Sequence, residues 1–497
     1  MAKPSTRRRS NMKRLYVPVL LALAAAISAA SPGSADTYYV PDDFVTIQAA
    51  LDAAANGDEI IVRDGTHAGT DLTFAGKALT LRSENGPSAC IIEGAESGWV
   101  FRFGNESSDS ILDGFTITHG PAGGIVCMSY SSLAITNCIV TGNGGEMAGF
   151  GGGIYCSYSD PTITNCVITD NSLGAFGDGG GIMCWSASPT IANCVISGNS
   201  VGYMGAGGGI HCYYYSSPVI TNCTITGNSA TDNGGGGGIY SMNSTPVITN
   251  CTISGNSSHF AGGGLHFEGA AGLETLINCI VWGNETALDV GNEIYIGTYG
   301  HVLTVGSTDV RDRLGFDDVY VDPLAILNWL EGNINADPLF VGAGDFHLTA
   351  GSPCVDSGAA AAIDDDIDGD PRPRGAGFDM GSDEFYEVSM RLVPDADEAS
   401  RGGSLGYDVT VTNHTDVVQT FEYWTMVRLP NGSMYPPSGA LFGPHTVNLP
   451  PFASGSAHLS HAIPVIAPLG MYTYNAYIGP NPPLPTNERH FDFEVAP

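Results

Sequence analysis

The sequence has few positively charged residues. Its 497 residues include 18 Lys and Arg against 51 Asp and Glu, and no Lys or Arg lies between Arg102 and Arg311. Six of the 18 basic residues precede residue 36, so the rest of the chain carries a formal charge of −39. A surface of this charge is poorly suited to nucleic acid and anionic membranes. We therefore expect no nucleic-acid partner, whereas cations, neutral glycans and basic proteins remain compatible.

Long apolar runs are missing after the N-terminus. The one such run, Leu15 to Ala30, follows a basic stretch and precedes small residues up to Ala35, as is typical of a signal peptide. A retained membrane anchor is the alternative interpretation. No later run approaches the roughly 18 residues that a membrane-spanning helix needs. We expect residues 1–35 to be removed and the mature chain, with no membrane span, to be secreted, extracellular or at the cell surface.

A repeat dominates the middle of the chain. The stretch GGGIYCSYSDPTITNCVITDNS at 151–172 returns as GGGIMCWSASPTIANCVISGNS at 179–200. Two sets of asparagines mark its period of 28 or 29 residues. The first set, each followed by Cys, is Asn137, Asn165, Asn193, Asn222, Asn250 and Asn278, and the second is Asn143, Asn171, Asn199, Asn228, Asn256 and Asn284. Units of this length must stack on copies of themselves to bury their apolar sides.

The repeat predicts an all-β right-handed parallel β-helix. Each coil holds short segments such as PTIT and CVIT, which are too short for helices and alternate inward and outward residues. Asparagines suit the sharp corners because they tolerate a left-handed backbone, and glycines serve the third corner. With coils about 4.8 Å apart, equivalent residues form ladders, in which the asparagine amides can hydrogen-bond to one another.

Other segments complete the predicted organisation. Between Thr46 as N-cap and a stop at Asn56 and Gly57, an apolar helical face predicts a helix that plugs the first coil. That face is Ile47, Ala50, Leu51 and Ala54. From residue 386 onward, strict alternation between turns predicts an immunoglobulin-like β-sandwich. The predicted parts are a signal peptide (1–35), a β-helix (36–385) with a cap (36–60), 28-residue coils (120–290) and a closing segment (291–385), and a β-sandwich (386–497).

Several motifs resemble known families. The coils resemble bacterial right-handed β-helix proteins of the pectin-lyase-like fold, and the pairing of GGGI with ITDN or ISGN is similar to polymorphic outer-membrane protein repeats, which favour Phe where this chain has Ile. The segments NINADPLF, DFHLTAGSPCVDSG and DIDGDPRPRGAGFDMGSDEF resemble the closing segment of β-helix proteins labelled choice-of-anchor. The resemblance implies a secreted or surface protein with variable anchoring.

The twelve cysteines fall mostly on ladders of the repeat. Export favours disulfides. However, a residue repeated at an inward strand position acts as a small apolar filler, and parallel neighbours in register are poorly oriented for a disulfide. We expect buried free thiols.

The predicted coils offer little for catalysis, although the pectin-lyase-like fold hosts polysaccharide lyases, glycoside hydrolases and esterases. Without Lys or Arg, the coils have no cationic base and no guanidinium to neutralise a uronate, which argues against a lyase. Glycoside hydrolysis needs two carboxylates, and no coil presents a clustered pair. We predict a protein that binds or presents a surface, such as a polysaccharide or the cell envelope. A carbohydrate-active enzyme is the alternative.

An outward row of aromatic and polar side chains is the candidate binding site. It comprises Tyr155, Met183, Trp185, His211, Tyr213, Tyr240 and His266. Flat rings on a rigid face suit sugars and protein partners, whereas ordinary β-propensity on an exposed strand is the simpler interpretation.

The closing segment contains a candidate calcium loop. Its sequence DDDIDGD places Asp364, Asp366 and Asp368 before Gly369, as at the start of a D-x-D-x-D-G loop, and Asp370 follows. Gly375 stands where such a loop has a bidentate Glu, so Asp379, Asp383 or Glu384 would have to substitute for it. The pattern is compatible with a calcium-binding loop and also with an acidic turn that is only solvated.

Overall fold

A computed structural model describes residues 35–496, apart from 96, 146–148, 270–271, 298–299, 315–316, 343, 362, 397, 416 and 481–486. The signal peptide predicted at 1–35 therefore lies, except for its last residue, outside the described residues. Among the described residues there is one α-helix, α1 (Ile47–Ala53), and every other regular element is a strand. That helix is far too short to cross a membrane, and the described part of the chain has no other helix. The predicted all-β class is confirmed.

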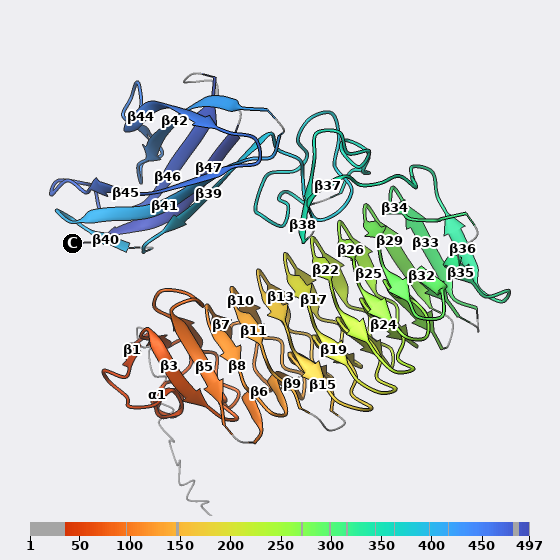
Figure 1. The fold of residues 1–497 in the computed structure, drawn as a ribbon. Coiled ribbons are helices and arrows are strands. Elements are labelled where there is room, and N and C mark those ends of the chain that lie inside the picture. The colour runs from red at the N-terminus through yellow and green to blue at the C-terminus, as the bar shows by residue number, and fades with distance from the viewer. Residues whose placement is uncertain are drawn as a thin grey trace, which may run out of the picture. The chain divides into compact units, whose positions relative to one another are not determined.

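Three parallel sheets form the coils of a right-handed β-helix (Figure 1). Sheet 1 contains, in spatial order, β1 (Thr37–Val40), β2 (Glu59–Val62), β4 (Thr80–Ser83), β7 (Ile111–Asp113), β10 (Ala134–Thr136), β13 (Thr162–Thr164), β17 (Thr190–Ala192), β21 (Val219–Thr221), β25 (Val247–Thr249), β29 (Leu273–Ile277), β33 (Val302–Gly306) and β36 (Ile326–Trp329). Sheet 2 contains β3 (Gly65–Gly69), β5 (Cys90–Gly94), β8 (Thr116–Thr118), β11 (Ile139–Thr141), β14 (Val167–Thr169), β18 (Val195–Ser197), β22 (Thr224–Thr226), β26 (Thr252–Ser254), β30 (Ile280–Trp282) and β34 (Asp309–Val310). Sheet 3 contains β6 (Trp99–Gly104), β9 (Gly123–Met128), β12 (Ile154–Ser157), β16 (Ile182–Trp185), β20 (Ile210–Tyr213), β24 (Ile239–Met242), β28 (Leu265–Glu268), β32 (Val290–Ile296) and β35 (Asp317–Val321).

A short fourth sheet follows the second asparagine set. It contains β15 (Ser172–Leu173), β19 (Ser200–Val201), β23 (Ser229–Ala230), β27 (Ser257–Ser258) and β31 (Glu285–Thr286). The repeat alone did not predict this sheet. The solenoid sheets also continue to β36, past the predicted end of the coils at residue 290, because pairing persists after the 28-residue spacing is lost.

The two asparagine sets have different structural roles at the corners of the coils. All members of the first set have a left-handed backbone, with φ between 51° and 55°. The second set forms a buried ladder, in which each Nδ2 donates to the Oδ1 of the next coil at 2.9 to 3.0 Å. At the ladder's end, the Nδ2 of Asn284 donates to the Oε2 of Glu293 at 2.6 Å. The predicted amide ladder is thus confirmed for the second set.

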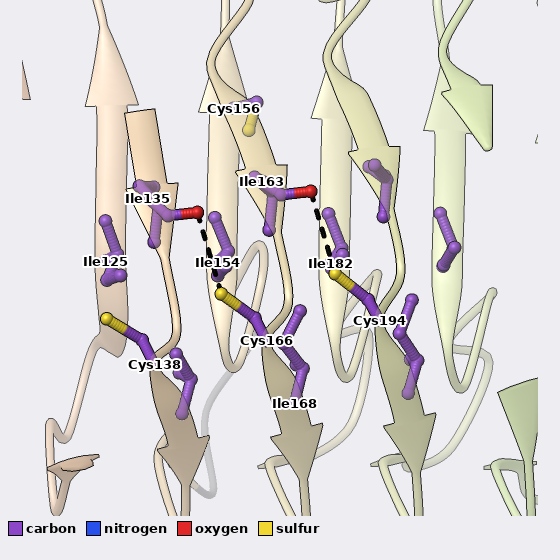
Figure 2. Close-up of a cluster of buried hydrophobic side chains, with 14 of the residues drawn as sticks. Ile125, Ile135, Cys138, Ile154, Cys156, Ile163, Cys166, Ile168, Ile182 and Cys194 are labelled. Atoms are coloured by element: carbon purple, nitrogen blue, oxygen red, sulfur yellow. Dashed lines mark hydrogen bonds between the residues drawn. The ribbon is translucent and has the colours of Figure 1, made fainter. Parts of the chain in front are cut away.

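Isoleucine and cysteine fill the solenoid core (Figure 2). Cys166 and Cys194 donate to the carbonyl oxygens of Ile135 and Ile163, each at 3.6 Å, as Figure 2 shows. All twelve cysteines are buried and none forms a disulfide. The prediction of buried free thiols is confirmed.

The cap helix forms as predicted at its start. Thr46 Oγ1 accepts from the N–H of Ala49 at 3.2 Å, and the helix buries Ile47, Ala50 and Leu51. It ends at Ala53, before the predicted stop at Asn56 and Gly57.

After the solenoid, the hairpin of β37 (Phe340–Gly342) and β38 (Asp345–Leu348) opens the closing segment. The sandwich then pairs a sheet of β39 (Val388–Pro394), β41 (Ser404–Asn413) and β45 (Ser454–Ala462) with a sheet of β40 (Glu398–Ser400), β47 (Asn487–Ala496), β46 (Gly470–Gly479), β42 (Gln419–Arg428), β43 (Met434–Tyr435) and β44 (Phe442–Leu449). Their shared core includes Tyr407, Tyr474 and Phe493. The antiparallel strands are consistent with the predicted β-sandwich.

Candidate functional site

The outward side of sheet 3 carries the predicted binding row. Along β12, Ile154 and Cys156 are fully buried in the solenoid core, and Tyr155 between them is half-buried on the opposite side. Because the strands pair in register, the residues aligned with Tyr155 form one row. That row is Arg102, Val126, Tyr155, Met183, His211, Tyr240, His266, Tyr295 and Tyr320. Trp185 and Tyr213 are aligned with each other two residues farther along their strands.

Rings on this side of the sheet contact one another in series. Trp99 stacks on Tyr155 with 6.2 Å between ring centroids, and Phe150 contacts both Tyr155 (5.7 Å) and Trp185 (5.4 Å). Trp185 meets Tyr213 at 5.0 Å. The ring contacts continue from Tyr213 through the buried His211 to Tyr240. We call the part of the series before His211 the aromatic patch: Trp99, Phe150, Tyr155, Trp185, Tyr213, Tyr214 and Tyr215.

The aromatic patch is accessible to solvent. Tyr215 is 74% exposed, Tyr214 is 47% exposed and Phe150 is 39% exposed, and the remaining patch residues are partly exposed. The predicted residues Tyr155, Trp185 and Tyr213 therefore lie on one reachable surface.

Three other predicted residues are not reachable, and the prediction is corrected there. Met183, His211 and His266 are 0%, 4% and 1% exposed, although they point away from the solenoid core. The segment before each glycine run folds over them: Asp178 Oδ1 lies 3.5 Å from His211 Nδ1, and the carbonyl oxygen of Ala261 lies 2.9 Å from His266 Nδ1. These side chains are therefore covered and are not part of the exposed surface of the row.

Tyr240, His266 and Glu268 form a polar network beside the buried residues of the row. Tyr240 donates its hydroxyl to Glu268 Oε2 at 3.0 Å, and His266 Nε2 lies 3.2 Å from the same oxygen. The hydrogen bond from His266 lowers the pKa of Glu268, whose side chain is 40% exposed. Tyr240 itself is only partly exposed and its hydroxyl is engaged.

Backbone hydrogen bonds to Asp366 hold the acidic turn together. Asp366 is fully buried, and its Oδ1 accepts the N–H groups of Asp368 and Asp370 at 2.9 and 2.7 Å. Its Oδ2 accepts the N–H of Glu384 at 3.0 Å. Both oxygens of Asp366 therefore hold the turn together, and burial raises the pKa of this carboxyl.

The other members of the turn point to different partners. Asp364 is exposed, and Asp370 forms an ion pair with Arg489. Only Asp368, of the four predicted ligands, belongs to a group of three potential metal ligands among the described residues. Calcium at Asp364, Asp366, Asp368 and Asp370 remains a prediction.

That group joins Asp368 to His347 and Asp383. The three candidate ligand atoms all lie within 4.8 Å of one another. His347 Nε2 is 2.7 Å from Asp368 Oδ2, and its Nδ1 is 2.5 Å from Asp345 Oδ1. Although burial opposes protonation, the two hydrogen-bonded carboxylates raise the pKa of His347 to about 11.

The histidine–carboxylate group lines a cleft of about 1320 Å³. The cleft lies between the closing segment and the corner of sheets 1 and 2, where Asn165, Val167 and Asn193 form part of the opposite wall. The closing segment is docked on this corner through hydrogen bonds: Ser382 bonds to Thr224 and Thr252.

Sequence reasoning missed Phe150 and His347. Phe150 precedes a glycine run with no strand pattern around it, so nothing in the sequence places its ring beside Tyr155. His347 stands two residues after Asp345, which puts both on one side of β38. That spacing is the signal that could have found the pair.

Comparison with known proteins supports the solenoid. Residues 68–203 and 175–309 match the family model of the right handed beta helix region. No curated protein matches the chain.

The solved structures that match do so weakly. The chain is similar to the CARDB domain of the PF1109 protein from Pyrococcus furiosus (19% identity, 22% of this chain, 87% of that chain, TM-score 0.17). It is also similar to the alkylpurine DNA glycosylase AlkC of Pseudomonas fluorescens, with 13% identity over 22% of this chain and 31% of that chain and a TM-score of 0.19. A β-glucosidase from Listeria innocua matches with 16% identity over 22% of this chain and 16% of that chain and a TM-score of 0.17. At these TM-scores, none of the three bears on function.

Proposed function

We propose that this is a secreted or cell-surface β-helix protein that binds a polysaccharide or another component of a cell envelope without catalysis. The observation that carries the proposal is the aromatic patch: seven connected rings that remain accessible, four of them on strands of sheet 3 and three in the segments beside it. Exposed rings in contact with one another form an apolar surface with hydroxyl groups at its edge, which suits the faces of sugar rings and the rims of protein partners.

The spacing of the solenoid suits an extended ligand. Successive coils lie about 4.8 Å apart, so the aligned Trp185 and Tyr213 place rings on neighbouring coils, and Tyr155 adds a ring one coil earlier and two residues away along its strand. Since their strands are paired in register, these rings need little ordering when a ligand binds. The absence of Lys and Arg between Arg102 and Arg311 favours a neutral ligand over a polyanionic one.

Alanine variants test the binding proposal. A glycan array identifies a ligand, and calorimetry then compares the parent with the triple variant Trp185→Ala, Tyr213→Ala, Tyr215→Ala. We expect binding to weaken at least tenfold, which is about 1.4 kcal/mol. Tyr203→Ala is the matched control, because Tyr203 is 46% exposed and lies outside the patch. Equal affinity of the parent and the triple variant would remove the patch from the proposal.

One observation favours the alternative of a carbohydrate-active enzyme. Glu268 is a partly exposed carboxylate that accepts hydrogen bonds from Tyr240 and contacts His266, an arrangement that could hold a reacting group. The test is an assay for new reducing ends, unsaturated products and released acyl groups on each array hit. Turnover that Glu268→Gln abolishes would replace the binding proposal with the enzyme.

A further inference from the structure

We infer that His347, Asp368 and Asp383 form a binding site for one divalent transition-metal ion of the zinc class, with one coordination position open to the cleft. The site differs from the calcium loop predicted from the sequence: it shares Asp368 with that loop, and Asp383 is one of the three carboxylates that could replace the loop's missing Glu. It is independent of the aromatic patch and of the proposed function.

The geometry provides one nitrogen and two carboxylate ligands. A ring nitrogen of His347 and one oxygen each of Asp368 and Asp383 lie within 4.8 Å of one another, so a single ion between them can reach all three after small side-chain movements. His347 Nε2 lies 2.7 Å from Asp368 Oδ2, so the ion takes the place of the proton between these two atoms, and metal binding releases that proton. Asp345 accepts from Nδ1 of His347 at 2.5 Å. Such a carboxylate fixes the tautomer of a metal-binding histidine and aims Nε2 at the ion.

Asp383 is the more buried of the two carboxylates in the group. Its residue is only 7% exposed, and its Oδ2 accepts the backbone N–H of Leu348 at 2.7 Å. No Lys, Arg or His nitrogen in the described part of the chain lies within 4.0 Å of this carboxylate, and no hydrogen bond to Oδ1 is present there. A buried carboxylate is normally paired with a cation or coordinates a metal.

The donor set selects the class of ion. Calcium prefers six to eight oxygen ligands, and magnesium keeps most of its waters, whereas an imidazole with two carboxylates suits zinc and related ions. Three protein ligands leave a fourth position of a tetrahedron for water or for an oxygen of a molecule in the cleft. That position faces the cleft because His347, Asp368 and Asp383 all line it.

Metal titration of the full chain tests the inference. The protein is stripped with a chelator and titrated with zinc by calorimetry at physiological salt, where weak binding to the acidic surface is screened. Cobalt is titrated in parallel, because its visible d–d absorption reports nitrogen and oxygen ligands directly. We expect one site per chain, and competition between the two ions.

Variants assign the ligands. Asp383→Asn keeps an acceptor for Leu348 and should fold, yet should weaken zinc binding at least about 100-fold, as should His347→Gln. Asp345→Asn should weaken it by about 10- to 100-fold while leaving the stoichiometry at one. His458→Ala is the matched control, because His458 also lies between two carboxylates, Asp395 and Asp408, but is exposed.

Each other outcome overturns the inference. These outcomes are no zinc or cobalt binding by the parent, unchanged affinity in folded Asp383→Asn and His347→Gln, or an equal loss in His458→Ala. Calcium binding that Asp364→Asn abolishes, with no zinc site, would establish the acidic turn as the metal site instead.

Discussion

Asn199 uses every hydrogen-bonding position of its side chain. Its Nδ2 donates to the carbonyl of Ile168 at 2.8 Å and to Asn228 Oδ1 at 3.0 Å. Its Oδ1 accepts from the side chain and the backbone N–H of Asn171 at 2.9 and 3.1 Å. The residue is fully buried, so water cannot replace any of these bonds.

We therefore expect Asn199→Ala to be strongly destabilising. The substitution leaves polar groups of Asn171, Ile168 and Asn228 buried with fewer partners, and each unsatisfied group costs about 1–3 kcal/mol. The free energy of unfolding, measured by denaturant titration, should fall by about 2–4 kcal/mol. Thr190→Ala, an exposed position of the same coil, should change it by less than about 0.5 kcal/mol. Similar small effects for both variants would contradict a structural role for the ladder.

Asp309 links the end of the solenoid to the closing segment. It is fully buried, its Oδ1 accepts the N–H of Ala336 at 3.1 Å, and the thiol of Cys354 donates to its Oδ2 at 3.4 Å. Burial raises the pKa of Asp309 to about 6. The folded protein therefore binds this proton more tightly than the unfolded chain does.

The sign of the pH dependence follows from this raised pKa. Between about pH 4 and about pH 6 the folded state holds more protons at Asp309, so its contribution to the free energy of unfolding decreases as the pH rises, and is constant above that range. In Asp309→Asn the side chain does not titrate, so the free energy of unfolding of the variant lacks this pH-dependent decrease. The stability of the variant relative to the parent should therefore rise by up to about 3 kcal/mol across that range. Thermal unfolding at several pH values measures this difference in stability between the variant and the parent. Asp312→Asn is the control, because Asp312 is exposed. A difference independent of pH would show that Asp309 is ionised throughout.

Among the elements, the sequence predicts those that repeat. Alternation and the 28-residue spacing identify the strands of all three sheets in the coils. The asparagine pattern identifies the corners, because a left-handed φ at Asn165 and an amide ladder at Asn171 are local consequences of the residue type. Thr46 likewise identifies the start of α1, since its hydroxyl caps the helix in the way its position predicts.

The sequence could not predict which outward side chains are covered. The same alternation points His211 and Tyr155 away from the core. The burial of His211, however, involves Asp178, which precedes the glycine corner of the preceding coil. The sequence also could not predict that residues 358–382 dock on the solenoid. It uses backbone groups such as the carbonyl of Ala359, which accepts from Asn278 Nδ2 at 2.6 Å and has no sequence signature.

For the same reason, replacing Tyr155, His211 and Tyr240 together is a poor test of the binding row. The buried His211 and the hydrogen-bonded Tyr240 contribute to the loop packing, so their loss would mix folding with binding. Restricting the substitutions to Trp185, Tyr213 and Tyr215 separates the two.

The solenoid as a whole needs closed ends. Its first strands, β1, β3 and β6, begin the three sheets, and an uncovered strand edge would pair with another chain. Helix α1 packs on β1 and β2. Lys77 holds the end of this helix, with Nζ donating to the carbonyls of Leu51 (2.5 Å), Asp52 (3.1 Å) and Ala54 (2.8 Å).

Loosening this cap should cause self-association. Leu51→Asp places a charge at a position that is 1% exposed, so we expect α1 to detach and the first coil to become accessible to a second chain. Residues 36–497 carry a formal charge of −39, and mutual repulsion should keep even the variant monomeric at low salt. At about 0.5 M salt the repulsion is screened, and light scattering coupled to gel filtration should detect dimers and larger species that increase with protein concentration. Ala53→Asp adds the same charge on the exposed side of α1 and should remain monomeric. If Leu51→Asp stays folded and monomeric at high salt, then α1 is not what protects the first coil from other chains.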